Sequence, residues 1–540
     1  MTPVSPASTG LAGLVPAVRA AGGMALRDQV ELLVRPGRQS LVPGSAEALV
    51  RGDAGAGSGR IGKDAVTSVA GLRSVTLAAS TQAFPALMVS VNQEGGRLNA
   101  LDWPEVVQLP GGMALGAAAD ADLAEQAGTA IGGQLRAAGV TWNLAPVCDL
   151  AGWPSQPAVG TRAFGSDPGL AAVLAAAFVR GLQAAGVAAT AKHFPGLGGA
   201  AADPHHAAPV LDELPAGALL PFRAAIQAGV ACVMAGSQTV RAVGDRPALA
   251  SRRMLGLLRD GLGFGGVIVT ENLSIPAVHE PLGGVAHAAV AAVAAGADMV
   301  MLDSEFSRGG QPHQQRAAAV RLRREVIGAL VAAVETGLIS PGQVAESAAR
   351  ALDLHRRFGI GPGTPAPRWE AANAAAREVA DQVATRSVAV LRGAHLLPLV
   401  PEPGTALPLV RVPDTGNRKA DSARYAPDFL PALLGGWFTV LPLSPGRSLP
   451  PGDGPAVVYG YDTRDGEGLS GAAQEAIRLK RQPRVVVQVA LGDPDDLAGS
   501  PADVLVAAFS PHHASAGAVS RVLSGGLRAC GAVPVEGTAW

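Results

Sequence analysis

Short apolar runs alternate with longer helical stretches between Pro85 and Asp303, and this alternation limits what the chain can fold into. Strands separated by helices are typical of a parallel sheet, because the chain must cross back before each new parallel strand. The predicted strands are Ala86–Val91, Val140–Leu144, Val187–Ala191, Ala231–Ala235, Gly266–Thr270 and Asp298–Leu302. The predicted helices between them are Asp120–Ala138, Asp167–Ala185, Ala216–Ala228, Arg252–Gly261 and Val285–Ala295. The region is therefore predicted to be an α/β domain.

These strand and helix units predict a TIM-type (β/α)8 barrel. Six units, together with a less regular N-terminal segment, come close to the eight that such a barrel needs. A doubly wound sheet would normally carry a glycine-rich phosphate loop after its first strand, and the sequence has none there. The N-terminal end of the barrel is expected to be irregular. Its glycine-rich stretch RGDAGAGSGRIG, at 51–62, is predicted to be either a flexible loop or a reduced barrel unit.

The length of 540 residues predicts a second, smaller domain, because one hydrophobic core rarely organises so long a chain. Helices at Ala317–Thr336 and Pro341–Phe358 are expected to close the first domain, and GIGPGTPAPRW is typical of a linker. Further alternating strands are predicted at Ala456–Gly460, Arg484–Val489 and Asp503–Ala508. We therefore predict a barrel domain over 1–362, a linker and connecting helix over 363–395, and an α/β sandwich domain over 396–540.

The charge balance argues against nucleic acid or a membrane surface as the partner. Acidic and basic residues nearly cancel, with a formal net charge of -1, so no strong field would attract a polyanion. The most apolar window, Ala286–Leu302, contains Gly296 and Asp298 and is too short and alanine-rich to span a bilayer. The N-terminal segment lacks the basic start and continuous apolar run of a secretory signal, so we expect a cytoplasmic protein that is a monomer or a weak homodimer.

The three cysteines, Cys148, Cys232 and Cys530, indicate neither a disulfide framework nor a zinc site. They are odd in number, far apart and free of any CxxC spacing. We expect all three to be buried thiols, and we predict no metal and no cofactor.

Polar motifs follow the predicted strands, where a barrel carries its chemistry. The four segments are VNQEGGRL at 91–98, VGTRAFG at 159–165, AKHFPGLGGAAADPHH at 191–206 and VTENLS at 269–274. The third segment resembles the KHFPGHGxxxxDSHH signature of glycoside hydrolase family 3, in its β-N-acetylhexosaminidase branch. The resemblance extends over about residues 80–360 through LPGGMALGAAAD, WNLAPVCDL and GLGFGGVIVTENLS. The tail FSPHHASAGAVSRVLSGGLRACGAVPV is similar to the second domain of many family members.

The resemblance implies a retaining glycosidase that forms a covalent glycosyl-enzyme. In this branch the acid/base is a histidine, which corresponds to His205, and its carboxylate partner corresponds to Asp203. The Asp-x-His spacing fits this role, because residues two apart on an extended segment project to the same side. Lys192, His193 and Arg162 correspond to residues that bind the sugar.

The sequence departs from the family pattern in several places, and three of the changes concern one pocket. The nucleophile position carries Glu271 where the family has aspartate, and glutamate is one methylene longer. Asn92 replaces an aspartate that binds sugar hydroxyls, and Ala100 replaces an arginine. The segment AGSQ at 235–238 replaces a TAH-type segment. The chain is thus expected to hydrolyse glycosides with an altered pocket or to have lost turnover.

The resemblance implies an exo-acting β-N-acetylhexosaminidase that releases terminal N-acetylglucosamine, with recycled cell-wall fragments as one candidate source. The alternative from another class is a catalytically impaired sugar-binding or regulatory protein on the same scaffold. Phosphorolysis is an open variant, because a neutral histidine repels phosphate less than a carboxylate does. Metal-dependent hydrolysis through His193, Asp203, His205 and His206 is a weaker alternative. His512 and His513 are expected on a surface loop of the second domain.

Overall fold

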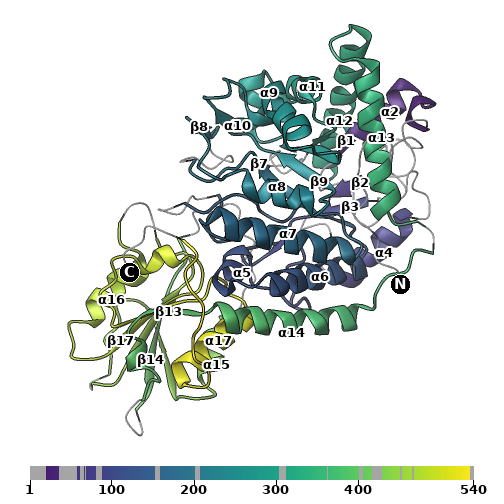
Figure 1. Cartoon of the computed structure of the whole chain (residues 1–540). Coiled ribbons are helices and arrows are strands. Elements are labelled where there is room, and N and C mark those ends of the chain that lie inside the picture. Colours follow the sequence, from purple (N-terminus) through teal and green to yellow (C-terminus); the bar gives the residue numbers. More distant parts are fainter. Residues whose placement is uncertain are drawn as a thin grey trace. The chain divides into compact units, whose positions relative to one another are not determined.

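The computed structural model divides the chain into two compact units, each built from segments that are not contiguous in sequence (Figure 1). The first unit comprises Met1–Gln93, Gly128–Asp149 and Ala175–Asn373, and the second comprises Glu94–Ala127, Leu150–Leu174 and Ala374–Trp540. The structure describes residues 20–35, 58–60, 66, 68–80, 88–152, 158–200, 207–302, 312–361, 363–400, 405–415, 428–450, 453–464 and 468–535. The contiguous domain boundaries inferred from the sequence stay a prediction.

Eight parallel strands of the described residues form the barrel of the first unit. They are β1 (Val34–Arg35), β2 (Ser58–Arg60), β3 (Met88–Val91), β6 (Trp142–Asn143), β7 (Thr190–Phe194), β9 (Cys232–Ala235), β11 (Val267–Asn272) and β12 (Met299–Met301). Their spatial order is β2, β3, β6, β7, β9, β11, β12 and β1. Sequential strands thus pair in parallel, as in a TIM barrel, and the predicted (β/α)8 fold is confirmed.

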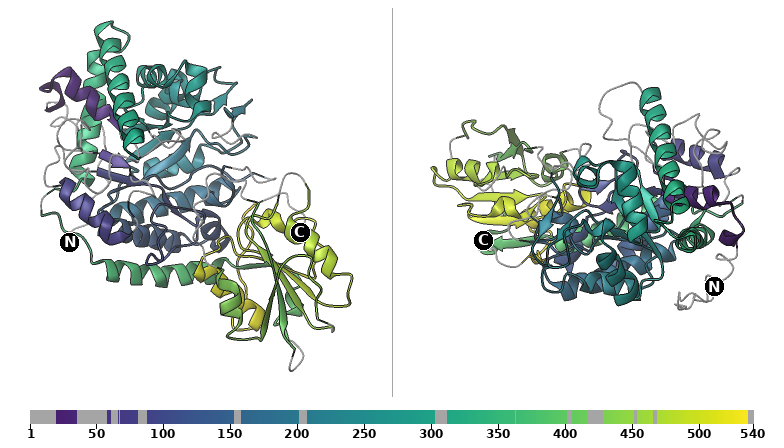
Figure 2. Two further views of the ribbon diagram at one scale, coloured as in Figure 1. Left: turned by 180° about the vertical axis from the view of Figure 1, so that it is seen from behind. Right: turned by 90° about the horizontal axis from the view of Figure 1, so that it is seen from above.

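Helices alternate with these strands and lie outside them, as α8, α11, α12 and α13 show in Figures 1 and 2. The helices up to the end of the barrel are α2 (Leu26–Leu33), α4 (Val69–Ser80), α6 (Ala121–Ala137), α7 (Pro168–Ala184), α8 (Leu220–Gln227), α9 (Arg252–Gly256), α10 (Pro276–His279), α11 (Val285–Ala295), α12 (Pro312–Glu335) and α13 (Pro341–Phe358). Their starts follow local chemistry. The Ser340 hydroxyl, for example, accepts a hydrogen bond from the Gln343 N–H, and Pro341 occupies the first turn of α13.

The barrel core is filled by buried strand residues and a few paired polar groups. Every residue of β3, β7, β9 and β11 is buried. The wholly buried Trp142 donates from its indole nitrogen to the Thr190 hydroxyl at 2.7 Å, so neither polar group is left without a partner. The pairing of β11 with β12 shifts between Val269 and Asn272, so that β11 carries one extra residue there. This bulge lies at the position of Glu271.

Short elements connect the barrel units and include a π-helical turn after α9. They are β4 (Gln93–Gly95), β5 (Leu98–Asn99), β8 (Val210–Leu211), β10 (Thr239–Val240), η3 (Gly160–Arg162), η4 (Ala248–Ala250), η5 (Leu257–Gly261) and η6 (Glu280–Leu282). The pair β8 and β10 is parallel. Helix α5 (Gly112–Ala118) belongs to the second unit.

The second unit contains a six-stranded, mostly parallel sheet, which confirms the predicted second α/β domain. Its strands are β13 (Ala389–Arg392), β14 (Leu407–Val412), β15 (Val440–Leu443), β16 (Ala456–Gly460), β17 (Val486–Ala490) and β18 (Val504–Ala507), in the order β15, β14, β16, β17, β18 and β13, with β13 antiparallel. Helix α16 (Gly471–Leu479) covers one face, and α15 (Phe429–Leu434) and α17 (His513–Ser524) cover the other (Figures 1 and 2). Helix α14 (Trp369–Ser387), η8 (Ala394–Leu396) and η10 (Pro494–Leu497) complete the elements.

Two expectations about single residues were wrong. Cys148 and Cys232 are buried as expected, but Cys530 is exposed, because it follows α17 in an irregular segment rather than a core strand. His512 is buried and immediately precedes α17, and its Nε2 lies 2.7 Å from the carbonyl oxygen of Gly96. Only His513, the first residue of the helix, is exposed.

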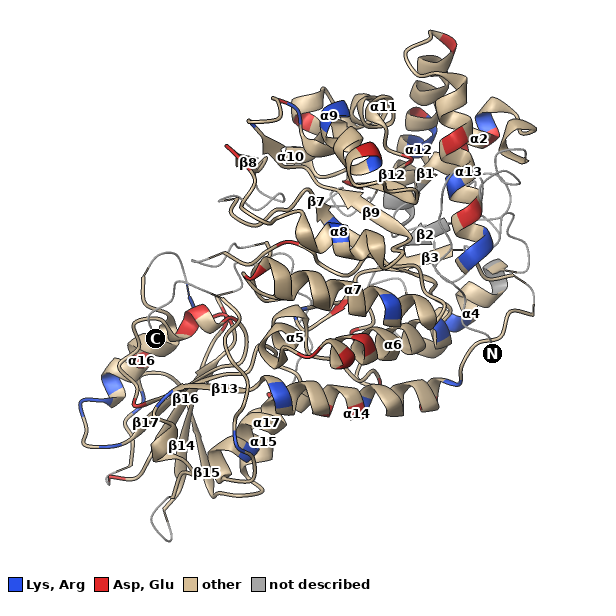
Figure 3. Cartoon of the chain, viewed as in Figure 1, with Lys and Arg blue, Asp and Glu red and all other residues tan. Residues whose placement is uncertain are grey.

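The surface carries both signs of charge. Figure 3 shows basic and acidic residues interspersed along the drawn helices, in keeping with the formal net charge of -1. Among the described residues, no helix combines the length and the apolar character that crossing a bilayer requires.

Candidate active site

The barrel brings the predicted site residues of the first unit to one end of its strands. Asn92 directly follows β3, Lys192 and His193 lie in the last half of β7, and Glu271 is the penultimate residue of β11. Because these strands are parallel neighbours, their carboxyl ends meet at the same mouth of the barrel. These residues thus lie at one mouth of the barrel, and their roles in a site stay a prediction.

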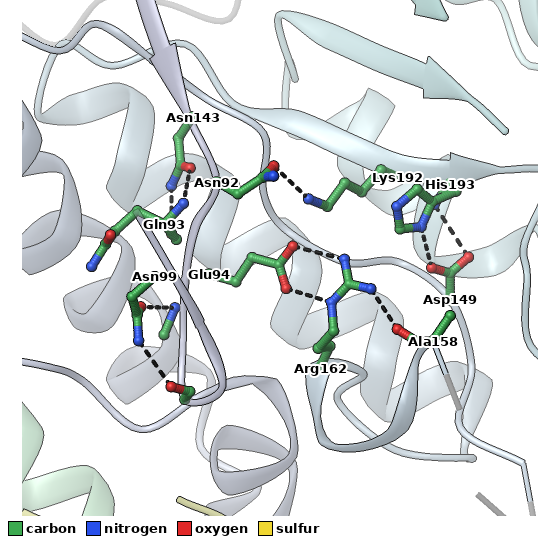
Figure 4. A network of polar contacts seen from close by, with 12 residues as sticks. Asn92, Gln93, Glu94, Asn99, Asn143, Asp149, Ala158, Arg162, Lys192 and His193 are labelled. Carbon is green, nitrogen blue, oxygen red and sulfur yellow. Dashed lines mark hydrogen bonds and ion pairs between the residues drawn. The ribbon is translucent and has the colours of Figure 1, made fainter. Parts of the chain in front are cut away.

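Lys192 is held by the side-chain amide of Asn92. Its ammonium donates to the Asn92 side-chain oxygen at 3.1 Å, and the lysine is only 2% exposed (Figure 4). The neighbouring Gln93 is fixed by Asn143, whose side chain accepts from the Gln93 N–H and donates to its carbonyl. A neutral amide keeps the contact with the buried cation but provides a weaker acceptor than a carboxylate would.

His193 is oriented by Asp149, a residue that the sequence interpretation quoted in a motif but gave no role. Its Nδ1 lies 2.7 Å from Asp149 Oδ2, and its backbone N–H donates to Oδ1 at 3.2 Å (Figure 4). The Leu197 N–H also donates to Oδ1, at 2.7 Å. Burial alone would raise the pKa of Asp149, but the His193 charge and these hydrogen bonds outweigh burial and lower it. Asp149 is therefore a buried anion that fixes the imidazole.

The same positional rule that located the other residues could have found Asp149. It follows an apolar run, and Val147 forms a parallel bridge with Lys192. The peptide bond between Lys192 and His193 is cis.

Glu271 is largely buried, at 8% exposed, and its carboxylate is fixed at one oxygen. The Ser237 N–H, at the end of β9, donates to Oε2 at 3.0 Å. Among the described residues Oε1 has no hydrogen-bond partner. Glu271 lies within the register shift of β11 between Val269 and Asn272. The carboxylate is thus oriented through Oε2, while Oε1 is left to contact a ligand.

Arg162 lies in the second unit, in η3, and binds a carboxylate that the sequence interpretation did not consider. Its Nε and Nη2 each donate to a Glu94 oxygen at 2.8 Å, and Nη1 donates to the Ala158 carbonyl (Figure 4). Both side chains are buried, so the pair is a well-formed fork between planar groups. The predicted sugar contact of Arg162 stays a prediction, and Glu94 is the residue that would orient the guanidinium for it.

The predicted acid/base pair, Asp203 and His205, lies outside the described residues, as does His206. Of the four residues considered as metal ligands, only His193 is therefore described, and its Nδ1 contacts Asp149. In the described part of the chain, no group of three histidine, cysteine or acidic side chains is arranged to hold a metal ion.

Comparison with known proteins places this geometry in a family. The glycosyl hydrolase family 3 N-terminal domain matches residues 61–354. A β-N-acetylglucosaminidase/β-glucosidase of Cellulomonas fimi is 32% identical over 339 residues, which cover 58% of this chain and 56% of that protein. A β-hexosaminidase of Pseudomonas aeruginosa is 42% identical over 221 residues, which cover 40% of this chain and 65% of that protein. This chain thus spans less than two thirds of the length of these relatives.

A solved structure gives a longer match. The family 3 β-N-acetylglucosaminidase from Paenibacillus sp. strain FPU-7 superimposes with a TM-score of 0.78 at 27% sequence identity, and the match covers 95% of this chain and 99% of that one. The matched family domain spans more than half of the chain and contains Asn92, Lys192, His193 and Glu271. The chain belongs to glycosyl hydrolase family 3.

Proposed function

We propose that the protein is an exo-acting, retaining β-N-acetylhexosaminidase that releases terminal N-acetylglucosamine. The proposal rests above all on Glu271, a buried carboxylate at the barrel mouth with Oε2 held by an amide and Oε1 without a partner among the described residues. It is supported by the named activities of the similar proteins from Cellulomonas, Pseudomonas and Paenibacillus.

In the proposed reaction the Oε1 atom of Glu271 attacks the anomeric carbon of the sugar. The bond between that carbon and the leaving oxygen breaks, the proton of His205 passes to the leaving oxygen, and a glycosyl-enzyme ester forms. A water then attacks the same carbon and gives its proton to His205, and the ester bond to Glu271 breaks. Asp203 would orient His205 through both steps.

The sugar would be held by the polar groups that flank Glu271. Asn92 and the Lys192 it binds offer an amide and an ammonium, and the Asp149-oriented His193 offers a ring nitrogen. Such donors and acceptors match the hydroxyls and the acetamido group of N-acetylglucosamine. Recycled cell-wall fragments are the proposed source of the substrate. The cytoplasmic location and the monomeric or weakly dimeric state stay predictions.

The first experiment measures release of aryl leaving groups from a panel of aryl β-glycosides, led by the β-N-acetylglucosaminide. Glu271→Gln is the matched control, because glutamine keeps an acceptor for the Ser237 N–H but is a much weaker nucleophile. We expect turnover of the N-acetylglucosaminide by the wild type, and a loss of at least about 10³-fold in kcat for Glu271→Gln with sugar affinity largely retained.

The other outcomes separate the alternatives. Unchanged turnover by Glu271→Gln would show that another group is the nucleophile. Sugar binding without turnover on any glycoside would support the sugar-binding protein instead. A sugar 1-phosphate that appears only when inorganic phosphate is added would identify phosphorolysis.

A further inference from the structure

The segment Gly236–Gln238, between β9 and β10, links Glu271 to β7. The Gly236 N–H donates to the carbonyl of Phe194 at 2.9 Å, and the Gln238 side-chain nitrogen donates to the carbonyl of His193 at 2.9 Å. Between these two contacts, the Ser237 N–H donates to Glu271 Oε2. The segment therefore fixes the carboxylate relative to the end of β7, which carries Lys192 and His193.

Gly236 and Gln238 depend on one another. The Gln238 side chain folds back over Gly236, and a Cβ atom added at residue 236 would lie 2.1 Å from Gln238 Oε1. Any side chain at 236 would displace the Gln238 amide from its position against β7. Gln238 is wholly buried, and on its other side the Gln238 and Gly236 carbonyls accept from the N–H groups of Ala248 and Leu249 in η4. The segment is thus clamped between β7 and η4.

The contact that reaches the carboxylate comes from the backbone. The Ser237 hydroxyl is buried and has no hydrogen-bond partner among the described residues, so what Ser237 supplies to Glu271 is its N–H. A backbone donor has a fixed position only if the residues on either side of it are fixed. Gly236 and Gln238 provide this on the two sides of Ser237.

We propose that Gly236, Ser237 and Gln238 act as a positioning element that fits the barrel to a glutamate at position 271. This inference rests on the proposed function, in which Glu271 is the nucleophile. Glutamate has one more rotatable bond than aspartate, so its carboxylate needs an external anchor to stay in attack geometry. The Ser237 N–H is that anchor at Oε2, and it leaves Oε1 to react. Gln238 acts only through Ser237, without contact to the reacting atoms.

The test uses Gln238→Leu, which removes the contact to His193, and Gly236→Ala, which displaces the Gln238 amide without deleting it. Ser237→Pro would delete the anchoring N–H but would also impose the proline φ on the segment. The matched control is Gln183→Leu. Gln183 accepts from the Ala231 N–H at 2.8 Å and donates to the Gly229 carbonyl at 2.9 Å, just before β9 begins. Full-length protein is used throughout, and thermal unfolding shows that each variant is folded.

We expect Gln238→Leu and Gly236→Ala to lower kcat on the aryl β-N-acetylglucosaminide by roughly 10- to 100-fold, with KM changed by less than about threefold, because the carboxylate is displaced from the anomeric carbon. Gln183→Leu should leave kcat within about twofold of the wild-type value, even if it lowers the unfolding temperature as much as Gln238→Leu does. An equal loss of kcat in Gln183→Leu and Gln238→Leu would overturn the proposal.

A double-mutant cycle tests whether Gln238 acts through the length of the side chain at 271. The shorter carboxylate of Glu271→Asp loses the anchor at Ser237, so adding Gln238→Leu should change kcat by less than about threefold. If Gln238→Leu costs the same factor in both backgrounds, the segment does not act through Glu271 and the proposal is wrong.

A second measurement does not depend on turnover. Hydrogen exchange of peptides that cover residues 236–238 should quicken in Glu271→Ala and in Gln238→Leu, because the Ser237 N–H loses its carboxylate or its position, but not in Gln183→Leu. If the wild type turns over no glycoside, the proposed function fails while this measurement still decides whether the anchor exists. Equal exchange in the wild type and Glu271→Ala would refute the anchor itself.

Discussion

His193 shows how a buried histidine at the barrel mouth is given one orientation. A free imidazole could rotate and present either nitrogen to a sugar. In the structure, Asp149 binds Nδ1 and at the same time receives the backbone N–H groups of His193 and Leu197. Ring, backbone and carboxylate are therefore fixed together, and only the opposite edge of the ring is left for a ligand.

Asp149→Asn should both destabilise the barrel and weaken sugar binding. The variant removes the buried carboxylate that holds His193 and places an NH2 group against a ring nitrogen, so the free energy of unfolding should fall by about 2–4 kcal/mol, and KM for the aryl N-acetylglucosaminide should rise about tenfold. Denaturant unfolding and steady-state kinetics measure the two effects. Asp212→Asn is the control, because its ion pair with Arg241 is exposed, and the stability change there should stay within about 0.5 kcal/mol. Wild-type stability and KM in Asp149→Asn would contradict the orienting role.

The sequence singled out polar residues that stand next to apolar runs, but it did not predict which residues they would bind. Lys192, His193 and Glu271 stood out because charged residues directly follow apolar runs. Glu94 and Ser237 became meaningful only when distant segments met, since nothing in local spacing pairs Glu94 with Arg162 or Ser237 with Glu271. The Ser237 contact is also made by the backbone, which leaves no trace in the residue type.

At the scale of elements, helix α5 shows why Arg162 sits where it does. The glycines Gly112 and Gly116 of α5 face the segment that carries Arg162. A Cβ atom at Gly112 would lie 2.3 Å from the Arg162 carbonyl oxygen, and one at Gly116 would lie within 1.6 Å of the Phe164 carbonyl oxygen. The absence of side chains at these two positions lets the helix lie directly against the backbone of η3 and the residues after it.

Gly116→Ala should therefore push η3 away from α5. We expect the free energy of unfolding to fall by about 1–3 kcal/mol, because the added methyl group meets backbone that must shift. If Arg162 binds the sugar, KM should rise as well. Gly133→Ala in α6 is the control, since its Cβ would meet only the Ala372 methyl at 3.8 Å, and it should be neutral or stabilising by up to about 1 kcal/mol. Equal stability of the two variants in thermal unfolding would show that α5 does not set the position of η3.

Many element positions followed from the sequence pattern, and the shift of one strand has a physical cause. Helices α11 and α13 and strand β16 have the predicted bounds. Strand β7 was expected at Val187–Ala191 but lies at Thr190–Phe194. The apolar run ends at Ala191, so Lys192 and His193 were expected just beyond the end of the strand. They extend the strand because Asn92 and Asp149 satisfy their polar groups.

At the scale of the whole chain, the second unit gathers segments from three regions of the sequence. Within it, Arg97 of the QEGGRL motif forms a buried ion pair with Asp462 after β16, and His512 before α17 contacts the Gly96 carbonyl. The segment with Gly96 and Arg97 is thus bound by residues that follow strands of the six-stranded sheet, at the carboxyl end where α/β sheets usually bind ligands. Neither contact could be predicted, since each joins residues several hundred positions apart.

Burial of His512 makes the stability of this unit depend on pH. Desolvation lowers the pKa of His512 from 6.5 to about 4. As the pH falls from 6.5 to 4, the unfolded chain takes up a proton at this histidine that the folded chain does not. The free energy of unfolding should therefore fall by about 3 kcal/mol over this range, at 1.36 kcal/mol per pKa unit.

Denaturant unfolding at pH 7, 5 and 4 checks this dependence. His512→Gln should be less stable than the wild type at pH 7, because the ring no longer fills its buried site, but its stability should fall less between pH 7 and 4. Asp149, whose pKa is lowered in the fold, is present in both proteins, so its contribution to the pH dependence is the same in the two curves. Parallel curves for the two proteins would show that His512 is not the group responsible.

The division of the second unit into separate stretches also governs when it can be completed during synthesis. Its early stretches end at Leu174 and its main body begins at Ala374, so about 200 residues must be translated between them. At roughly 5–20 residues per second, Leu150–Leu174 waits roughly 10–40 s for the main body of the unit to begin to leave the ribosome, and Glu94–Ala127 waits longer. The later barrel strands emerge meanwhile, so a nascent chain stalled before Ala374 would display these two stretches to chaperones without the six-stranded sheet of their unit.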